Sequence, residues 1–212
     1  MTDQNIKQLF SRAYILGGTP CSGKSTLAER LSNEFAFQYY KVDDHESEHA
    51  RRIDPNRHPV MIKYAQMSWD ERWMRPVSCQ VEELFDYYHE RFEMIVQDLE
   101  NYDHESPIVL EGAAYLPDLL VSNNANPERV LFLVPSSEFQ RAHYSLRPWI
   151  NQILKGCEDP EQAFENWMMR DQLFGKEILL QSKAGSYGTI LVDGSKNIDQ
   201  QYEVVKHLFK IK

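Results

Sequence analysis

Short apolar runs alternate with segments of helical periodicity along this chain of 212 residues. The runs are rich in Val, Ile, Leu and Tyr, and three are almost unbroken, as in strands buried on both faces of a parallel sheet. The five runs lie at 13–16, 37–42, 108–112, 129–134 and 189–192. Strands that alternate with helices predict an α/β fold with a five-stranded parallel sheet and right-handed crossovers.

Apolar stripes at helical spacing fill most of the segments between the runs. They predict a helix over 25–35, the longest helix over 77–102 and the last helix over 199–211. No internal repeat, low-complexity segment or Gly/Ser-rich linker interrupts the chain. We therefore predict a single domain over 1–212.

Two segments depart from this alternation. Residues 45–76 are polar and aromatic, and residues 136–182 are helical in pattern without a strand signal. Long excursions from a compact α/β core are often lids or substrate-binding elements. The alternative is that both segments are additional packing helices.

Charge and cysteine content limit the classes of function. The net charge of -9 argues against a general nucleic-acid binder, although a local positive pocket can still hold a small anion. The three cysteines, Cys21, Cys79 and Cys157, are too widely spaced for a disulfide framework or a zinc motif. No signal-peptide core and no apolar run of about 18 residues is present, so we expect a cytoplasmic protein that does not bind membranes.

The segment GTPCSGKS, residues 18–25, matches G-x-x-x-x-G-K-[ST] at every fixed position. Glycines let successive backbone N–H groups turn toward phosphates without Cβ clashes, and the following helix adds its N-terminal dipole. Lysine reaches the β and γ phosphates, and the serine hydroxyl is a Mg²⁺ ligand. The residues expected to bind a nucleoside triphosphate are Gly18, Thr19, Pro20, Cys21, Ser22, Gly23, Lys24, Ser25 and Thr26, with Ser25 on the metal.

The strand, loop and helix over 13–35 resemble the P-loop kinase superfamily. The N-K-x-D and D-x-x-G motifs of switch GTPases are not found, and a short chain with an N-terminal P-loop resembles small-molecule kinases of the shikimate, gluconate, nucleoside or zeta-toxin kind. This resemblance implies a three-layer P-loop NTPase fold, with ATP and Mg²⁺ as cofactors.

Two adjacent carboxylates, Asp43 and Asp44, close the second predicted strand. Because the carboxyl ends of parallel strands face the ligand crevice, one of them is placed to accept or orient the proton of an acceptor hydroxyl. In the kinases that this chain resembles, an aspartate here binds the acceptor or the Mg²⁺ shell, which also makes Asp43 a metal candidate. The alternative is that the pair caps the next helix.

Glu111 ends the third predicted strand in the segment IVLEG. This arrangement resembles a Walker B acid, which holds Mg²⁺ directly or through water. The same segment is similar to the EG segment of 2-phosphoglycerate kinases and some zeta-type toxins, in which the third strand lines the acceptor pocket. A surface carboxylate at a strand end is the alternative.

Cations above the transferred phosphate are expected after the fourth strand, where the resemblance implies a lid. The candidates are Arg141, Arg147 and Arg170. Arg141 and Arg147 lie six residues apart, which departs from the common lid pattern of two arginines three or four apart and leaves their individual roles open.

Four arginines in the first excursion, Arg51, Arg52, Arg57 and Arg75, fall where the resemblance implies an acceptor-binding element. They indicate either an anionic acceptor or ion pairs with nearby carboxylates. Nearby, His45 and His49 have zinc-like i, i+4 spacing, but no motif supplies a third ligand, and Mg²⁺ is the metal expected.

The loop after the last strand contains Gly194, Ser195 and Lys196. In related kinases this loop passes the adenine, so we expect Gly194 and Ser195 to contact the nucleotide. The alternative is a plain turn into a helix capped by Asn197 or Asp199.

Together these features predict an ATP-dependent phosphotransferase that moves the γ-phosphoryl group of Mg·ATP to a hydroxyl of a small anionic metabolite. The protein is expected to act as a monomer or homodimer, without nucleic acid. The alternatives are a zeta-toxin-like kinase of a nucleotide sugar and a non-catalytic ATP-binding regulatory module. Pocket shape decides which acceptor binds, and the sequence does not show that shape.

Overall fold

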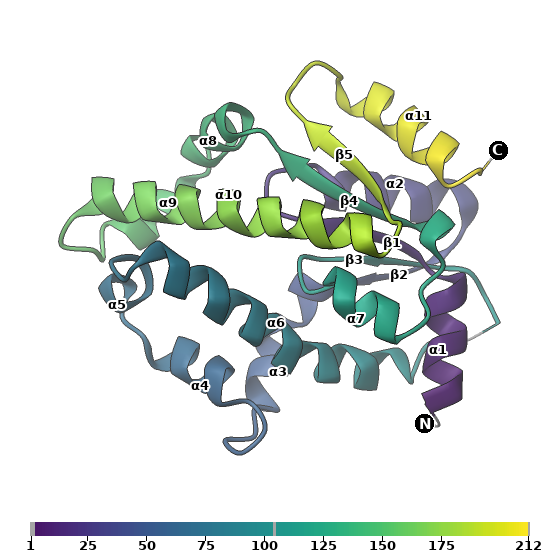
Figure 1. Cartoon of the computed structure of the whole chain (residues 1–212), viewed down its shortest axis with the longest axis horizontal. Coiled ribbons are helices and arrows are strands. Elements are labelled where there is room, and N and C mark those ends of the chain that lie inside the picture. The colour runs from purple at the N-terminus through teal and green to yellow at the C-terminus, as the bar shows by residue number, and fades with distance from the viewer. Residues whose placement is uncertain (1–2, 104, 212) are drawn as a thin grey trace.

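A five-stranded parallel sheet forms the centre of the computed structural model, which describes residues 3–103 and 105–211 (Figure 1). The strand order is β2-β3-β1-β4-β5, and every neighbouring pair is parallel. Each predicted run overlaps one strand, which confirms the predicted fold class. The strands are β1 Tyr14–Gly18, β2 Gln38–Lys41, β3 Ile108–Glu111, β4 Val130–Pro135 and β5 Gly188–Val192.

The sheet is buried on both faces because consecutive apolar side chains of its strands point in opposite directions. Ile15 and Phe132 enter one core cluster, while their neighbours Leu16 and Leu133 enter the other. All four of these side chains are fully buried. Unbroken apolar strands therefore require a layer of helices on each side of the sheet.

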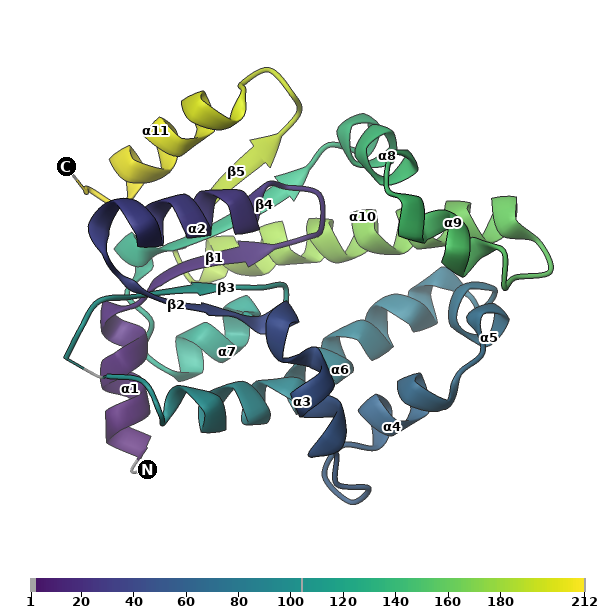
Figure 2. The same ribbon diagram turned by 180° about the vertical axis from the view of Figure 1, so that it is seen from behind.

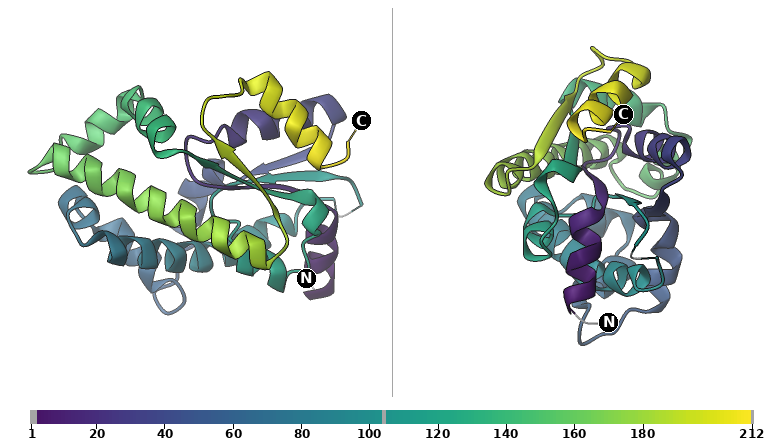
Figure 3. Two further views of the ribbon diagram at one scale, coloured as in Figure 1. Left: turned by 45° about the horizontal axis from the view of Figure 1, so that its top comes forward. Right: turned by 90° about the vertical axis from the view of Figure 1, so that its right-hand side faces the viewer.

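Two helices cover one face of the sheet and four cover the other (Figures 1 and 2). Leu27 and Tyr202 anchor the first pair, and Phe92 and Phe174 anchor two helices of the second group. The first pair is α2 Lys24–Phe35 and α11 Ile198–Leu208, and the second group is α1 Asp3–Arg12, α6 Val77–Leu99, α7 Pro117–Ser122 and α10 Pro160–Ala184. Figure 3 shows α10 crossing the sheet on the side opposite α2 and α11.

The two excursions are helical and lie at the same end of the molecule, on the left in Figure 1 and the right in Figure 2. Trp73 of the first excursion stacks on Trp167 of the second, with ring centroids 4.0 Å apart. The two segments therefore share a small apolar core of their own. Besides α10, their elements are η1 Val42–His45, α3 Glu46–Arg51, α4 Pro59–Gln66, α5 Trp69–Trp73, α8 Ser137–Ser145 and α9 Pro148–Leu154, and a further short helix, η2 Pro127–Arg129, precedes β4.

The register of the sheet brings the ends of three strands together. Glu111, the last residue of β3, lies opposite Leu16 of β1 and Lys41 of β2. The loop after Gly18 and the turn containing Asp43 begin at this same edge. The parallel topology thus gathers residues that are about 90 positions apart in sequence.

Candidate active site

The loop between β1 and α2 has a backbone that only particular residues can adopt. Gly18 has φ +109°, and a Cβ atom at this position would lie 2.1 Å from the carbonyl oxygen of Leu133. Cys21 and Gly23 also have positive φ angles, of 64° and 81°. This conformation delivers the chain to the first residue of α2, Lys24, so the helix N-terminus faces the loop.

Lys24 lies inside the loop rather than on the surface. Lys24 is 7% exposed, and its Nζ donates to the carbonyl oxygen of Thr19 at 2.8 Å. Burial lowers the pKa of Lys24, and the negative charges of Glu111 and Asp43 oppose that shift. The ammonium group is therefore placed among carboxylates in a site of low polarity, where a phosphate would be a strong partner.

Glu111 contacts the loop from the end of β3. Glu111 is 2% exposed, and Ser25 Oγ donates to Glu111 Oε2 at 3.2 Å. Burial raises the pKa of Glu111, while Lys24 and the Ser25 hydroxyl act in the opposite direction. A hydroxyl and a carboxylate side by side are oxygen ligands of the kind that Mg²⁺ prefers.

In the part of the chain that the structure describes, no group of three or more His, Cys, Asp or Glu residues could hold a metal ion. His45 instead approaches Glu48, with 3.3 Å between Nδ1 and Oε2, and His49 is engaged with Asp98 at 2.7 Å. A metal at the loop would have Ser25 and Glu111 as candidate protein ligands, with Asp43 of the same cavity as a third, and would need phosphate oxygens or water to complete its coordination.

Two cavities are lined by residues of this loop, and a third adjoins one of them. We call the three the P-loop cavity, about 290 Å³, the lid-side cavity, about 590 Å³, and the arginine cavity, about 290 Å³. The P-loop cavity is lined by residues 20–26 together with Asp43, Tyr88, Glu111, Ala113 and Arg147.

The lid-side cavity extends the P-loop cavity toward α8 and α11. Both are lined by Cys21, Ser22, Gly23, Thr26 and Arg147. The far wall of the lid-side cavity contains Phe139, His143, Val192, Gly194, Lys196, Asn197, Ile198 and Gln201. Gly194 and Lys196 thus line this cavity, whereas Ser195 does not. Asn197 also caps α11 by accepting from the Gln200 N–H, as one alternative predicted.

The arginine cavity lies on the opposite side of the P-loop cavity, between α3, α4, α5 and α6. Its lining residues are Asp43, Glu46, Ala50, Ile53, Met61, Tyr64, Ala65, Arg72, Leu84, Tyr87, Tyr88 and Arg91. Asp43 and Tyr88 line both this cavity and the P-loop cavity. These two residues therefore mark the junction of the two spaces.

The structure separates the two adjacent aspartates. Asp43 lines the junction, whereas Asp44 is bound to Lys41 at 3.2 Å with a side chain that is 66% exposed. Neither aspartate caps α3, whose N-cap is His45. Only Asp43 is thus positioned to reach groups in both cavities.

The three candidate lid arginines have different surroundings. Arg147 lines both the P-loop cavity and the lid-side cavity. Arg141 instead forms a two-bond ion pair with Glu165, at 2.6 Å for each bond, outside these cavities. Arg170 is buried, bonds Asp171 and lies over the Trp73 ring at 4.7 Å. The structure therefore brings Arg147 to the P-loop cavity and leaves Arg141 and Arg170 in contacts elsewhere.

Most of the arginines that suggested an anionic acceptor are already neutralised. Arg52, Arg57 and Arg75 form ion pairs with Asp98, Glu93 and Glu83, all on α6. For these three, the ion-pair alternative holds. The guanidinium groups that line the arginine cavity are those of Arg72 and Arg91.

Arg72, Arg91 and Tyr88 are three polar lining residues that the sequence did not single out. Among the described residues, neither Arg72 nor Arg91 forms an ion pair with a carboxylate; Arg72 donates to the Tyr64 carbonyl, and its Nε is buried without a partner. In the sequence, Arg91 is a charged residue next to the apolar stripe of the longest predicted helix. Tyr88 lies on that stripe, and burial raises its pKa.

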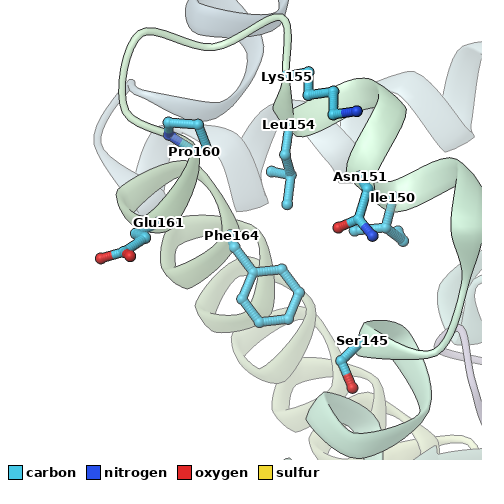
Figure 4. A pocket seen from close by; sticks show the side chains of 8 residues that line it. All are labelled: Ser145, Ile150, Asn151, Leu154, Lys155, Pro160, Glu161 and Phe164. Atoms are coloured by element: carbon cyan, nitrogen blue, oxygen red, sulfur yellow. The ribbon is translucent and has the colours of Figure 1, made fainter.

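A fourth cavity, about 460 Å³, lies at the far end of the lid region between α9 and the start of α10 (Figure 4). It is mainly apolar, with Ile150, Leu154 and Phe164 in its walls. It shares no lining residue with the other three cavities. We therefore place no part of the site in it.

A search for membrane-spanning segments found no helix among the described residues that is both long and apolar enough to cross a bilayer. No family model matches the sequence, and no curated protein matches it.

Comparison with solved structures identifies the fold. Shikimate kinase from Bacteroides thetaiotaomicron superposes with a TM-score of 0.50 at 16% identity, over 93% of this chain and 96% of the kinase. Deoxyadenosine kinase from M. mycoides with bound dATP matches with a TM-score of 0.49 at 12% identity, over 94% and 99% of the two chains. A gluconokinase from Sinorhizobium meliloti 1021 matches with a TM-score of 0.41 at 15% identity, over 95% and 93%.

The fold conclusion rests on the first of these matches together with the strand order β2-β3-β1-β4-β5 and the loop after β1. The chain has the fold of the P-loop small-molecule kinases, as the sequence predicted.

Proposed function

We propose that this protein transfers the γ-phosphoryl group of Mg·ATP to a hydroxyl group of a small anionic metabolite. The observation that supports this proposal most strongly is the junction of the P-loop cavity with the arginine cavity at Asp43 and Tyr88. A phosphotransferase needs a donor site and an acceptor site that meet at one point, with a base at the meeting point.

In this proposal the nucleotide phosphates bind the loop between β1 and α2. Their charge is matched by backbone N–H groups, by the α2 N-terminus and by Lys24. The base and ribose extend into the lid-side cavity, and Arg147 lies between that cavity and the P-loop cavity. Ser25 and Glu111 hold Mg²⁺, which neutralises phosphate charge when bound.

Asp43 is the proposed general base. The acceptor oxygen forms a bond to the γ-phosphorus, the bond from that phosphorus to the β–γ bridging oxygen breaks, and ADP leaves with the bond's electrons. The acceptor proton passes to the Asp43 carboxylate. Phosphoryl transfer depends mostly on positioning and charge neutralisation, so the proposed role of Lys24 and Arg147 is to hold and neutralise the phosphates.

The acceptor is proposed to carry an anionic group because of the two unneutralised arginines. Arg91 is 4% exposed and donates to His49 and to the Val42 carbonyl, and Arg72 is half-buried and donates to the Tyr64 carbonyl while its Nε stays unbonded. No carboxylate balances the charge of either guanidinium among the described ion pairs, and burying an unbalanced charge is costly. The other walls include Tyr64, Tyr87 and Met61, which offer apolar surface. A small acid with an apolar face fits a space of about 290 Å³.

This function can be tested by ADP release from Mg·ATP in the presence of metabolite extracts separated by charge. The proposal predicts slow release alone and strong stimulation by the anionic fraction. Lys24→Ala should lose turnover in every fraction. Stimulation by the neutral fraction only would contradict the anionic acceptor.

A response only to nucleotide sugars would favour the zeta-toxin-like alternative. Tight ATP binding without Lys24-dependent ADP release in any fraction would favour a non-catalytic regulatory module instead.

A further inference from the structure

A buried polar cluster lies beneath the arginine cavity. It contains His49 from α3, Arg91 and Asp98 from α6, Tyr40 from β2, and Arg52, the residue after α3. His49 is 0% exposed and Arg91 is 4% exposed. Buried polar side chains are stabilising only when their hydrogen bonds are satisfied, so the pattern of donors within this cluster is informative.

The partners of His49 determine its protonation state. Arg91 Nε lies 3.0 Å from His49 Nδ1, and a guanidinium can only donate, so Nδ1 must carry a lone pair. His49 Nε2 lies 2.7 Å from Asp98 Oδ2 and therefore donates to that carboxylate. The imidazole is neutral, with its one proton on Nε2.

The charges around His49 are consistent with this assignment. Burial lowers the pKa of His49, the bond to Asp98 raises it, and the positive charge of Arg91 lowers it again. Asp98 also accepts from Tyr40 Oη and from an Arg52 N–H, each at 2.6 Å, so its charge is shared among three donors. The remaining titratable neighbour is His45, whose ring centroid is 6.1 Å away.

Arg91 links this cluster to the junction of the two cavities. Its second donor bonds the carbonyl oxygen of Val42 at 2.8 Å. The Val42 side chain is held from the other side by Gly112, where a Cβ atom would lie 2.7 Å from Val42 Cβ. The next residue is Asp43, so the backbone that carries the junction carboxylate is fixed at Val42 from two directions.

The missing side chain of Gly112 thus makes room for Val42.

We propose that His49 is a positioning residue: in its neutral form it orients Arg91, which holds Val42 and thereby sets Asp43 at the junction of the two cavities. The inference rests on the proposed function for its effect on turnover. A proton added to His49 would lie on Nδ1 and point at the N–H of Arg91 Nε, which would break the bond between them. Acid thus loosens the turn that carries Asp43.

The first test compares three variants by the pH profile of Lys24-dependent ATP turnover, with water as the acceptor if no metabolite has been found. His49→Gln keeps one donor and one acceptor but does not titrate. We expect it to retain turnover within about 3-fold at pH 8 and to lose the decline that wild type shows below the ordinary histidine range. His49→Leu removes the partner of Arg91 Nε and one of the three donors to Asp98, and turnover should fall about 10–100-fold at every pH with ATP binding unchanged.

His89→Gln is the matched control, because His89 also lies on α6 and also pairs with a carboxylate, Asp118 at 2.7 Å, but at an exposed position. It should follow the wild-type profile. If His49→Gln also follows the wild-type profile, or if His89→Gln alters it equally, the inference is overturned.

A second measurement does not depend on catalysis. NMR of ¹⁵N-labelled histidines should show His49 with its proton on Nε2 at neutral pH, and the backbone amides of Asp43 and Asp44 should shift as His49 titrates. In His49→Gln those shifts should be absent. If wild type shows no Lys24-dependent turnover, the proposed function fails, and the amide shifts alone decide whether His49 is linked to the turn that carries Asp43. A proton on His49 Nδ1 at neutral pH, or amide shifts of Asp43 and Asp44 that do not change as His49 titrates, would refute the inference.

Discussion

Asp43 and Asp44 differ by one position in the chain but face different surroundings. Asp43 lines both the P-loop cavity and the arginine cavity, while Asp44 pairs with Lys41 at the surface. The short helix η1 separates them, since it turns consecutive side chains in different directions. At the scale of single residues, this difference in surroundings selects Asp43 rather than Asp44 as the proposed base.

Asp43→Asn should reduce turnover about 10²–10⁴-fold, because the amide cannot accept the acceptor proton. Asp44→Asn should stay within a few-fold of wild type, since it removes only an exposed ion pair. Steady-state ADP release measures both. Equal losses in the two variants would show that the junction does not define the base.

Glu111 gives a prediction about stability and pH. Burial raises its pKa, so the folded protein holds this proton more tightly than the unfolded chain does. The resulting stability is present below the ordinary glutamate range and is lost as the pH rises through the raised pKa. Wild type therefore carries the cost of a buried charge at pH 8.

Glu111→Gln removes that cost. Its melting temperature should be at least that of wild type at pH 8, and the difference should shrink as the pH falls and wild-type Glu111 takes up its proton. Turnover should nevertheless fall about 10–100-fold, because the proposed Mg²⁺ ligand is lost. Thermal unfolding between pH 8 and pH 4 checks the first point; a variant that is less stable than wild type at pH 8 would contradict the assigned shift.

At the scale of elements, α8 and α9 bring one arginine to the P-loop cavity and leave another outside it. Arg147, between the two helices, lines the P-loop cavity, whereas Arg141 is paired with Glu165 on α10. Arg147→Ala should lower turnover about 10²–10³-fold, the usual loss for a group that stabilises charge in the transition state.

Arg141→Ala is the control and should change turnover less than about 3-fold, because it removes only a surface pair. Each variant changes a single side chain of the α8–α9 segment. A comparison of their kcat values therefore separates the proposed role of Arg147 at the phosphates from the surface ion pair of Arg141. A larger loss for Arg141→Ala would move the lid function to that residue.

The stack of Trp73 on Trp167 joins α5 to α10 and holds the two excursions together. Trp167 is 5% exposed, so Trp167→Ala should reduce the free energy of unfolding by about 3–5 kcal/mol. Trp149, which is 42% exposed, is a matched control whose replacement by Ala should cost less. Denaturant unfolding compares them, and similar losses would show that the stack is not a shared core.

At the scale of the whole molecule, the sequence predicted the features that local patterns encode. All five strands were predicted because a buried parallel strand reads as an apolar run, and the loop was predicted because Gly18 and Lys24 obey strict spacing. The longest helix ends at Leu99 rather than at residue 102, since its last turns lie at a boundary that apolar spacing does not mark.

The arginine cavity was beyond prediction because its walls come from four helices that only tertiary packing brings together. Arg72 and Arg91 face the cavity while Arg52, Arg57 and Arg75 face carboxylates of α6, and one sequence contains no signal that separates the two groups. The same limit applied to Asp43 and Asp44, whose directions depend on a short helix after β2.

The most direct test of the account is to follow isotope from ATP labelled with ¹⁸O in the γ-phosphoryl group. Wild type, Mg²⁺ and a pool of anionic metabolites are combined, and mass spectrometry locates the label. The account predicts labelled phosphate on one small acid, dependent on Lys24 and on Asp43. Label that appears only in inorganic phosphate, or remains in ATP throughout, would contradict a phosphotransferase built on the junction of these two cavities.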